Sequence, residues 1–168
     1  MIIGIEGLST SGKTTLINKL IEKYPEIIRF RGAGAVNVGM QSRWQEYNFW
    51  MHNIIEQLDK LNNHKNIILW DRFLTDAVHS EDHLYRSEIL RVMKSHSKKA
   101  VVYIDVPENI LRDRGSKEGS ELNSHANRYD SIIKSFNTHI IKPSALEKHF
   151  ITDAHVDEVY NFIKTQMK

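Results

Sequence analysis

Eight consecutive residues near the start of the chain combine two glycines, a lysine and several hydroxyl groups. The segment runs Gly7-Leu8-Ser9-Thr10-Ser11-Gly12-Lys13-Thr14 and matches the pattern G-x-x-x-x-G-K-[ST]. Glycines let a backbone wrap closely around a phosphate, so that its amide groups point inward at the oxygens. A helix that follows such a loop presents its positive N-terminal end to the same oxygens. The pattern therefore predicts a loop that binds the phosphates of a nucleoside triphosphate, and we expect ATP.

The side chains of this loop have separate expected roles. Lys13 is placed to reach the β- and γ-phosphates, and the hydroxyl of Thr14 is placed to coordinate Mg²⁺. The hydroxyl groups at positions 9 to 11 either contact phosphate or brace the loop, and the sequence leaves both roles open. The full set of residues expected to bind ATP is Gly7, Leu8, Ser9, Thr10, Ser11, Gly12, Lys13, Thr14 and Thr15.

A second charged pair follows a buried apolar run. Asp71 and Arg72 come directly after Ile67-Ile68-Leu69-Trp70, and in open parallel sheets ligands bind at the carboxyl ends of the strands. Asp71 is expected either to hold the metal or to accept a proton from an attacking oxygen. Arg72 is expected to grip a phosphate of the donor or the acceptor with its planar guanidinium. An ion pair that only caps the strand is the structural alternative.

Two further arginines flank a segment that contains two glycines. Arg112 and Arg114 stand at the start of the loop Gly115–Gly119. Arginines on a lid that closes over a site neutralise charge on a transferring phosphoryl group and exclude water. We expect a short lid around residues 112–121 and a catalytic role for both arginines; a solvated basic helix end is the alternative.

Three residues are candidates for holding the acceptor. Arg31 follows the second predicted strand, and Arg43 stands near the start of an aromatic-rich helix. Either arginine is suited to an acceptor phosphate. Phe49 offers an aromatic face that suits a flat heterocycle, although aromatic side chains on helices also fill cores.

The elements that must position these residues alternate along the chain. Short runs of successive apolar residues predict strands that are covered on both faces, as in a parallel sheet. The predicted strands are Ile2–Glu6, Ile27–Phe30, Asn66–Trp70, Ala100–Asp105 and His149–Ile151.

Apolar residues at steps of three and four predict the helices between these strands. One apolar face begins at Leu16, after the glycine loop, and further helices are predicted over Leu84–Ser95 and Val156–Met167. Two longer stripes consist of Trp44, Tyr47, Met51, Ile54, Leu58 and Leu61, and of Leu122, Ala126, Tyr129, Ile133, Phe136 and Ile140. The first of these stripes is equally suited to face the sheet or a partner subunit, so a homodimer is a further expectation.

Composition limits the classes of protein that the chain can represent. The 168 residues fit one domain, spanning 1–168, and no repeat or linker divides them. No apolar run approaches the roughly 18 residues that a membrane helix needs. The absence of cysteine excludes disulfides and thiolate chemistry. The formal charge of +2 is spread along the chain, which argues against a nucleic-acid partner. We expect a cytoplasmic protein that does not contact membranes.

Taken together, these motifs resemble the thymidylate kinase-like group of P-loop nucleotide kinases, including the related deoxynucleoside kinases. The resemblance covers most of the chain and is most specific in the loop up to Thr15. The other matching segments are Asp71-Arg72-Phe73 with Thr75 and Ala77, Tyr103–Glu108 with Leu111–Arg114, Asn127-Arg128-Tyr129, and Ile151–Ala154 with Glu158-Val159.

This resemblance implies a three-layer α/β fold with a five-stranded parallel sheet and helices on both faces. It also implies ATP as donor, a nucleotide-like acceptor over the central helices, and acceptor-binding roles for Arg128 and Tyr129. The chain departs from the group in three places. Ser9 replaces an acidic residue of the thymidylate kinase loop, Arg29–Gly34 only echoes the segment Arg-Glu-Pro-Gly-Gly, and the substrate helix motif Phe-x-x-Asp-Arg has no clear match.

The leading hypothesis is a nucleoside monophosphate kinase that acts on dTMP or another deoxynucleotide, in nucleotide biosynthesis. The first alternative is a deoxynucleoside kinase that phosphorylates a sugar hydroxyl with Asp71 as the base, and the second is a P-loop kinase for another small metabolite. An acceptor-phosphate set of Arg31, Arg72 and Arg43 favours the leading hypothesis, because a neutral nucleoside would not require it.

The sequence disfavours two classes of protein outside the small-molecule kinases. A GTP-dependent switch would carry a guanine-reading element, Asn/Thr-Lys-x-Asp, after a strand, and the sequence contains none. A nucleic-acid end kinase would favour a basic groove, which the balanced charge does not indicate.

Overall fold

Five parallel strands form the centre of the molecule. The computed structural model describes residues 1–31, 43–62, 66–79, 83–95, 99–116, 119–144 and 150–167. The strands are β1 (Ile2–Glu6), β2 (Ile27–Arg31), β3 (Ile67–Asp71), β4 (Lys99–Ile104) and β5 (Thr138–Ile141). Their order across the sheet is β2-β3-β1-β4-β5, so the strand that leads into the glycine loop is the central one. Every residue of β1 and β3 is buried, as expected for strands covered on both faces.

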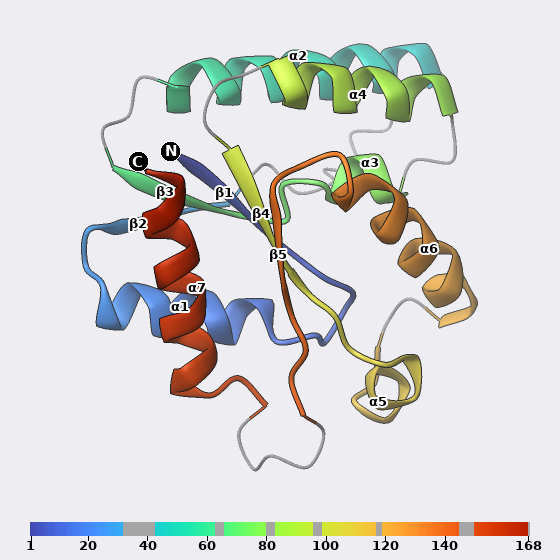
Figure 1. Ribbon diagram of the computed structural model, residues 1–168. Coiled ribbons are helices and arrows are strands. Elements are labelled where there is room, and N and C mark those ends of the chain that lie inside the picture. The colour runs from blue at the N-terminus through green and yellow to red at the C-terminus, as the bar shows by residue number, and fades with distance from the viewer. Residues whose placement is uncertain are drawn as a thin grey trace.

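Helices cover the two faces of this sheet (Figure 1). On one face lie α1 (Lys13–Lys23) and α7 (Asp153–Gln166). The opposite face carries α2 (Arg43–Asn62), α3 (Thr75–His79), α4 (His83–Ser95) and α6 (Leu122–Ile133). For every helix except α7, which follows the last strand, this division follows from right-handed crossovers, because the chain moves one way across the sheet after β1 and the other way after β2, β3 and β4. The three-layer α/β fold with a five-stranded parallel sheet is confirmed.

A short helix and a single 3₁₀ turn lie between β4 and α6. Helix α5 covers Glu108–Asp113, with Pro107 directly before it, and the 3₁₀ turn covers Gly119–Glu121. Pro107 suits this position because a proline has no amide hydrogen to lose at a helix start.

The long stripe of α2 packs inside the chain. Met51, Ile54, Leu58 and Leu61 are buried in the same apolar cluster as the strands. This half of the stripe therefore faces the chain's own core. The side chains of Trp44 and Tyr47 lie outside the described residues.

The prediction for the fifth strand was wrong. We placed it at His149–Ile151, whereas β5 is Thr138–Ile141 and Ile151 lies in a bend just before α7; His149 lies outside the described residues. The stripe from Leu122 to Ile140 was predicted as one helix, but α6 ends at Ile133. The Thr138 hydroxyl donates to the carbonyl of Ile133 at 2.7 Å and closes the helix end. Thr138, Ile140 and Ile141 are β-branched and favour a strand.

Other boundaries differ by a few residues. Helix α7 begins at Asp153, three residues before the predicted Val156, because Thr152 caps it. Strand β3 extends to Asp71, so the carboxylate belongs to the strand end itself. Among the helices that the structure describes, none is long and apolar enough to cross a membrane.

Candidate active site

The glycine loop connects the carboxyl end of β1 to the start of α1. Gly7 and Gly12 have φ angles of 142° and 99°, and Thr10 has a φ of 63°. Positive φ angles strain residues that carry a Cβ atom. A Cβ at Gly7 would also lie 2.6 Å from Ser11 Oγ and 2.8 Å from the carbonyl oxygen of Ile104. Both glycines of the motif are therefore required by the backbone path of the loop.

Lys13 lies across this loop. Its Nζ donates to the carbonyl oxygens of Gly7 and Leu8, both at 2.6 Å, and lies 3.4 Å from Ser11 Oγ. The residue is only 6% exposed, so a positive charge is held directly above the loop backbone.

The first turn of α1 fits an anion. It contains no acidic residue, and its N-cap, Gly12, supplies no side-chain hydrogen bond. The amides of a helix N-terminus, with the helix dipole behind them, attract phosphate oxygens. Thr14 and Thr15 are exposed in the same turn. The loop, the lysine and the helix end together fit a polyphosphate, and Thr14 offers a hydroxyl oxygen of the kind that Mg²⁺ accepts.

Asp71 ends β3, beside the carboxyl end of β1. Its backbone pairs with Ile5, and the residue is 5% exposed. Arg29 on β2 donates from Nη2 to Asp71 Oδ2 at 2.6 Å. The sequence did not single out Arg29 as a site residue. A charged arginine within the apolar run of β2 is the feature of the sequence that could have indicated a buried partner for Arg29.

Arg72 follows directly and has an exposed side chain. Its φ of 67° lies in the left-handed region that favours glycine. The amide of Arg72 donates to the carbonyl of Ile5 at 3.2 Å, which ties this strained position to β1. The backbone of Arg72 therefore lies beside the end of β1, two residues before the glycine loop.

Glu6 is a second residue that the sequence did not single out. It is fully buried as the last residue of β1 and directly precedes Gly7. Oε1 accepts the amide of Leu74 at 2.7 Å, and Oε2 accepts the hydroxyl of Tyr129 at 3.1 Å. Burial raises the pKa of the Glu6 carboxyl to about 8, although Leu74, Lys13 and Tyr129 act in the opposite direction. A carboxyl group at the end of the otherwise apolar strand β1 is the feature of the sequence that could have indicated a role for Glu6.

The two arginines that the sequence assigns to a lid differ in their partners. Arg112 pairs with Glu108 one turn earlier on α5, with Nε 2.7 Å from Oε1. Arg114 lies over the ring of Phe150, with its guanidinium carbon 4.2 Å from the ring centroid. Phe150 and Ile151 also border Gly12, since a Cβ there would lie 3.3 Å and 2.9 Å from their side chains. Arg114 is therefore connected to the edge of the glycine loop through Phe150.

Of the remaining residues predicted to bind the acceptor, the structure describes the side chains of Arg128 and Tyr129. Arg128 on α6 donates from Nη1 to the carbonyl of Val78 at 2.9 Å, and Tyr129 is 2% exposed. The side chains of Arg31, Arg43 and Phe49 lie outside the described residues. In the described ranges, no three His, Cys, Asp or Glu side chains gather into a group that could hold a metal ion.

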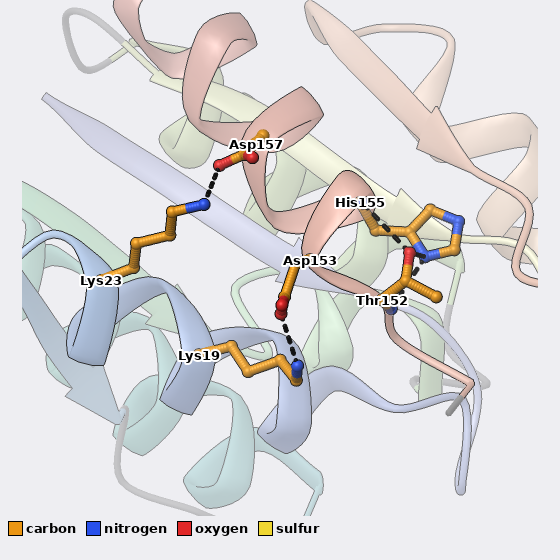
Figure 2. Close-up of polar contacts among 6 residues, drawn as sticks. All are labelled: Lys19, Lys23, Thr152, Asp153, His155 and Asp157. Carbon is orange, nitrogen blue, oxygen red and sulfur yellow. Dashed lines mark hydrogen bonds and ion pairs between the residues drawn. The ribbon is translucent and has the colours of Figure 1, made fainter. Parts of the chain in front are cut away.

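Helix α7 holds α1 from the side, as Figure 2 shows. Lys19 pairs with Asp153 at 2.7 Å, and Lys23 pairs with Asp157 at 2.5 Å. Tyr24 at the end of α1 also donates to Asp157, at 2.7 Å. These contacts fix the start of α7, and hence Ile151, against the helix that follows the glycine loop.

Comparisons with known proteins show which solved structures have a similar fold. No protein-family model matches the sequence, and no curated protein matches it with significance. Among solved structures, the YorR protein of Bacillus subtilis, in complex with phosphorylated GDP, is similar with a TM-score of 0.64 and 15% identity, over 99% of this chain and 98% of that one.

Two further similar structures are named as kinases. Thymidylate kinase of Ehrlichia chaffeensis has a TM-score of 0.58 and 20% identity, over 100% of this chain and 98% of that one. Deoxyadenosine kinase of M. mycoides with bound dATP has a TM-score of 0.61 and 16% identity, over 98% of this chain and 100% of that one. The chain therefore has the fold of the P-loop kinases, the group that the motifs resembled.

Proposed function

We propose that the protein is an ATP- and Mg²⁺-dependent phosphotransferase whose acceptor is a nucleoside monophosphate. The observation that supports this proposal most directly is that the carboxyl ends of β1 and β3 lie side by side. The glycine loop with Lys13 follows β1, Asp71 ends the neighbouring strand β3, and Arg72 comes directly after it, so donor-binding and charge-stabilising residues meet at one edge of the sheet. Phosphoryl transfer requires little covalent chemistry from the protein, because catalysis comes from the positioning of the substrates and from electrostatic stabilisation of the transition state.

The donor half of the reaction follows from the loop. The loop amides and Lys13 are proposed to hold the β- and γ-phosphates of ATP, and Arg114 lies over the ring of Phe150, which borders Gly12 of the loop. An oxygen of the acceptor attacks the γ-phosphorus, the bond to the β-phosphate oxygen breaks, and ADP leaves. Mg²⁺, held through Thr14 and Asp71, would supply charge neutralisation on the phosphates. Arg72, Arg112 and Arg114 are proposed to neutralise charge that develops on the transferred group.

An acceptor phosphate is supported by the exposed guanidinium of Arg72. It lies at the carboxyl end of β3, where its planar fork is suited to a phosphate. Similar structures are named for thymidylate, deoxyadenosine and a guanine nucleotide. Others are named for shikimate and a sugar, so the names support a small-molecule kinase without selecting the acceptor. On the strength of Arg72, we propose dTMP or another deoxynucleotide as the first to test.

A deoxynucleoside kinase is the second candidate, because the site contains two buried carboxyl groups. A sugar hydroxyl must lose a proton as it attacks, and a carboxylate accepts that proton. Asp71 is 5% exposed, and Glu6 is fully buried with its pKa raised to about 8. Asp71 is the proposed base in this case, since the oxygens of Glu6 are engaged by Leu74 and Tyr129.

One assay separates these candidates. ADP release is measured with Mg²⁺ and ATP for each nucleoside and each nucleoside monophosphate. We expect turnover with at least one monophosphate, loss of turnover in Lys13→Ala, and retained turnover in Lys19→Ala, a matched lysine on α1 that pairs with Asp153. Thermal melts of both variants check that the fold persists.

Each alternative gives a different result in the same assay. Turnover of nucleosides with silent monophosphates would establish the second candidate. If every nucleotide and nucleoside stays silent while a sugar or an organic acid is phosphorylated, both nucleotide-directed proposals are wrong.

A further inference from the structure

Glu6 connects three separate elements of the protein. It ends β1, its Oε1 accepts the amide of Leu74 after β3, and its Oε2 accepts the hydroxyl of Tyr129 on α6. The carboxyl is fully buried, and removing either partner would leave a polar group unpaired in the core. The residue before the glycine loop is therefore also a structural joint between β1, β3 and α6.

The segment that this joint holds is the turn from β3 to α3. Arg72 in this turn has a φ of 67°, and such strain persists only where the surroundings impose it. Two hydrogen bonds from β1 impose it here: the Ile5 carbonyl accepts the Arg72 amide, and Glu6 accepts the Leu74 amide. The backbone conformation of the turn that carries Arg72 thus depends on Glu6 remaining in place.

Tyr129 binds the Glu6 oxygen that does not contact Leu74. It is 2% exposed, so its ring lies inside the core, where it packs beside Tyr103 with ring centroids 5.3 Å apart. Its hydroxyl also hydrogen-bonds the side chain of Thr75, the first residue of α3. Arg128, the residue before Tyr129 on α6, donates to the carbonyl of Val78, which like Thr75 is part of α3. Consecutive residues of α6 therefore contact the beginning and the later part of α3.

We propose that Tyr129 is a positioning residue which, through Glu6 and Thr75, sets the β3–α3 turn that carries Asp71 and Arg72. The inference rests on the proposed phosphotransfer function and replaces acceptor contact as the role of Tyr129. Since α6 follows the lid segment in the chain, the same contacts tie the helix after the lid to the charged groups of β3. Tyr129 thereby affects the chemical step without touching either substrate.

Tyr129→Phe tests this role by removing one hydroxyl group while keeping the ring. Tyr103→Phe is the matched control, because it removes a tyrosine hydroxyl from the same core and leaves both hydrogen bonds of Glu6 intact. Amide hydrogen exchange is measured by NMR in the unliganded proteins. The Leu74 amide of Tyr129→Phe should exchange at least about tenfold faster than that of the parent, while central β1 amides keep their relative protection.

Kinetics provide the second measurement. Tyr129→Phe should lower kcat at least about tenfold while the KM for ATP stays within about twofold, because the P-loop itself is untouched. Tyr103→Phe should leave kcat within about twofold of the parent. If Tyr129→Phe does not fold, Thr75→Val replaces it: the variant keeps the shape of the side chain but removes the hydroxyl that hydrogen-bonds Tyr129, and we expect faster exchange at Leu74 and a lower kcat than in the parent.

The outcomes distinguish this inference from the function it rests on. Normal Leu74 exchange and unchanged kcat in Tyr129→Phe would overturn the inference while parent turnover upholds the function. Equal losses in the Tyr129 and Tyr103 variants would also overturn it, because they would indicate general core packing. If the parent protein transfers no phosphate to any acceptor, the proposed function fails, and unaltered Leu74 exchange would then reject the structural coupling as well.

Discussion

Arg72 combines a charged side chain with a backbone conformation that favours glycine. Its φ of 67° costs a residue with a Cβ atom about 1 kcal/mol relative to glycine. We predict that Arg72→Gly is more stable than Arg72→Ala by about 1 kcal/mol, because both lose the guanidinium but only glycine relieves the strain. Urea denaturation of the two variants measures this difference.

Activity should not follow this gain in stability. Both Arg72 variants should lose at least about a hundredfold in kcat/KM, since neither can neutralise charge on a phosphate. An Arg72→Gly protein that is stabilised and fully active would show that the strained arginine serves neither substrate.

Glu6 makes the stability of the protein depend on pH. Its carboxyl has a pKa of about 8 in the folded chain, raised by burial from 4.5. Between these values the folded protein binds more protons than the unfolded chain, so the free energy of unfolding contributed by Glu6 falls as pH rises from about 4.5 to about 8. The size of this contribution is on the order of a few kcal/mol.

Glu6→Gln should flatten this part of the pH profile. Denaturant unfolding of both proteins at about pH 5 and about pH 8 provides the comparison. The parent should lose more stability than the variant between the two conditions. Parallel profiles for parent and variant would mean that the Glu6 carboxyl is ionised equally in the folded and unfolded states.

The site residues differed in how far the sequence could predict them. The identity of Lys13 and Thr14 followed from a local pattern, because eight consecutive residues contain the whole loop. Glu6 and Arg29 were missed because their partners are Leu74, Tyr129 and Asp71, which strand pairing brings near from distant parts of the sequence.

At the scale of elements, α7 is held at its first residue by a reciprocal cap. The amide of His155 donates to Thr152 Oγ1 at 3.4 Å, and the amide of Thr152 donates to His155 Nδ1 at 3.1 Å. Thr152 directly follows Ile151, which borders Gly12 of the glycine loop. The cap therefore stabilises both a helix and one side of the phosphate-binding loop.

Thr152→Ala should lower the free energy of unfolding by about 1 kcal/mol, the usual effect of losing an N-cap. Thr165→Ala is the control, because Thr165 lies near the other end of α7, where its exposed hydroxyl donates to the Phe162 carbonyl and accepts from the side chain of Gln166. The control should change stability by less than about 0.5 kcal/mol. Equal effects in the two variants, measured by thermal unfolding, would show that the cap contributes nothing specific.

Elements with strong local patterns were predicted well, and those that depend on context were not. Four strands and the buried half of the α2 stripe agree with the prediction, because runs of apolar residues determine them. The stripe through Ile140 misled the prediction, since residues after Ile133 continue the helical spacing by chance while Thr138 turns the chain into β5. A short strand at the sheet edge needs only a few β-branched residues, which a helical pattern can hide.

At the scale of the whole molecule, the strand order brings the chemistry together. Placing β1 between β3 and β4 sets the glycine loop beside Asp71 and Arg72, although about sixty residues separate them in the chain. The resemblance to nucleotide kinases predicted the parallel sheet, and similar structures confirm the fold. The acceptor could not be predicted in the same way, because its recognition depends on individual side chains rather than on the fold.

The central claim is that the β1–α1 loop binds the polyphosphate of ATP. Isothermal titration of the protein with ATP, with and without Mg²⁺, tests this claim directly, alongside Lys13→Ala. The parent should bind ATP more tightly with Mg²⁺ than without it, and Lys13→Ala should bind at least about tenfold more weakly, because it loses a buried charge at the phosphates. Failure of the parent to bind ATP in the presence of Mg²⁺, or equal affinity in the two proteins, would contradict the claim.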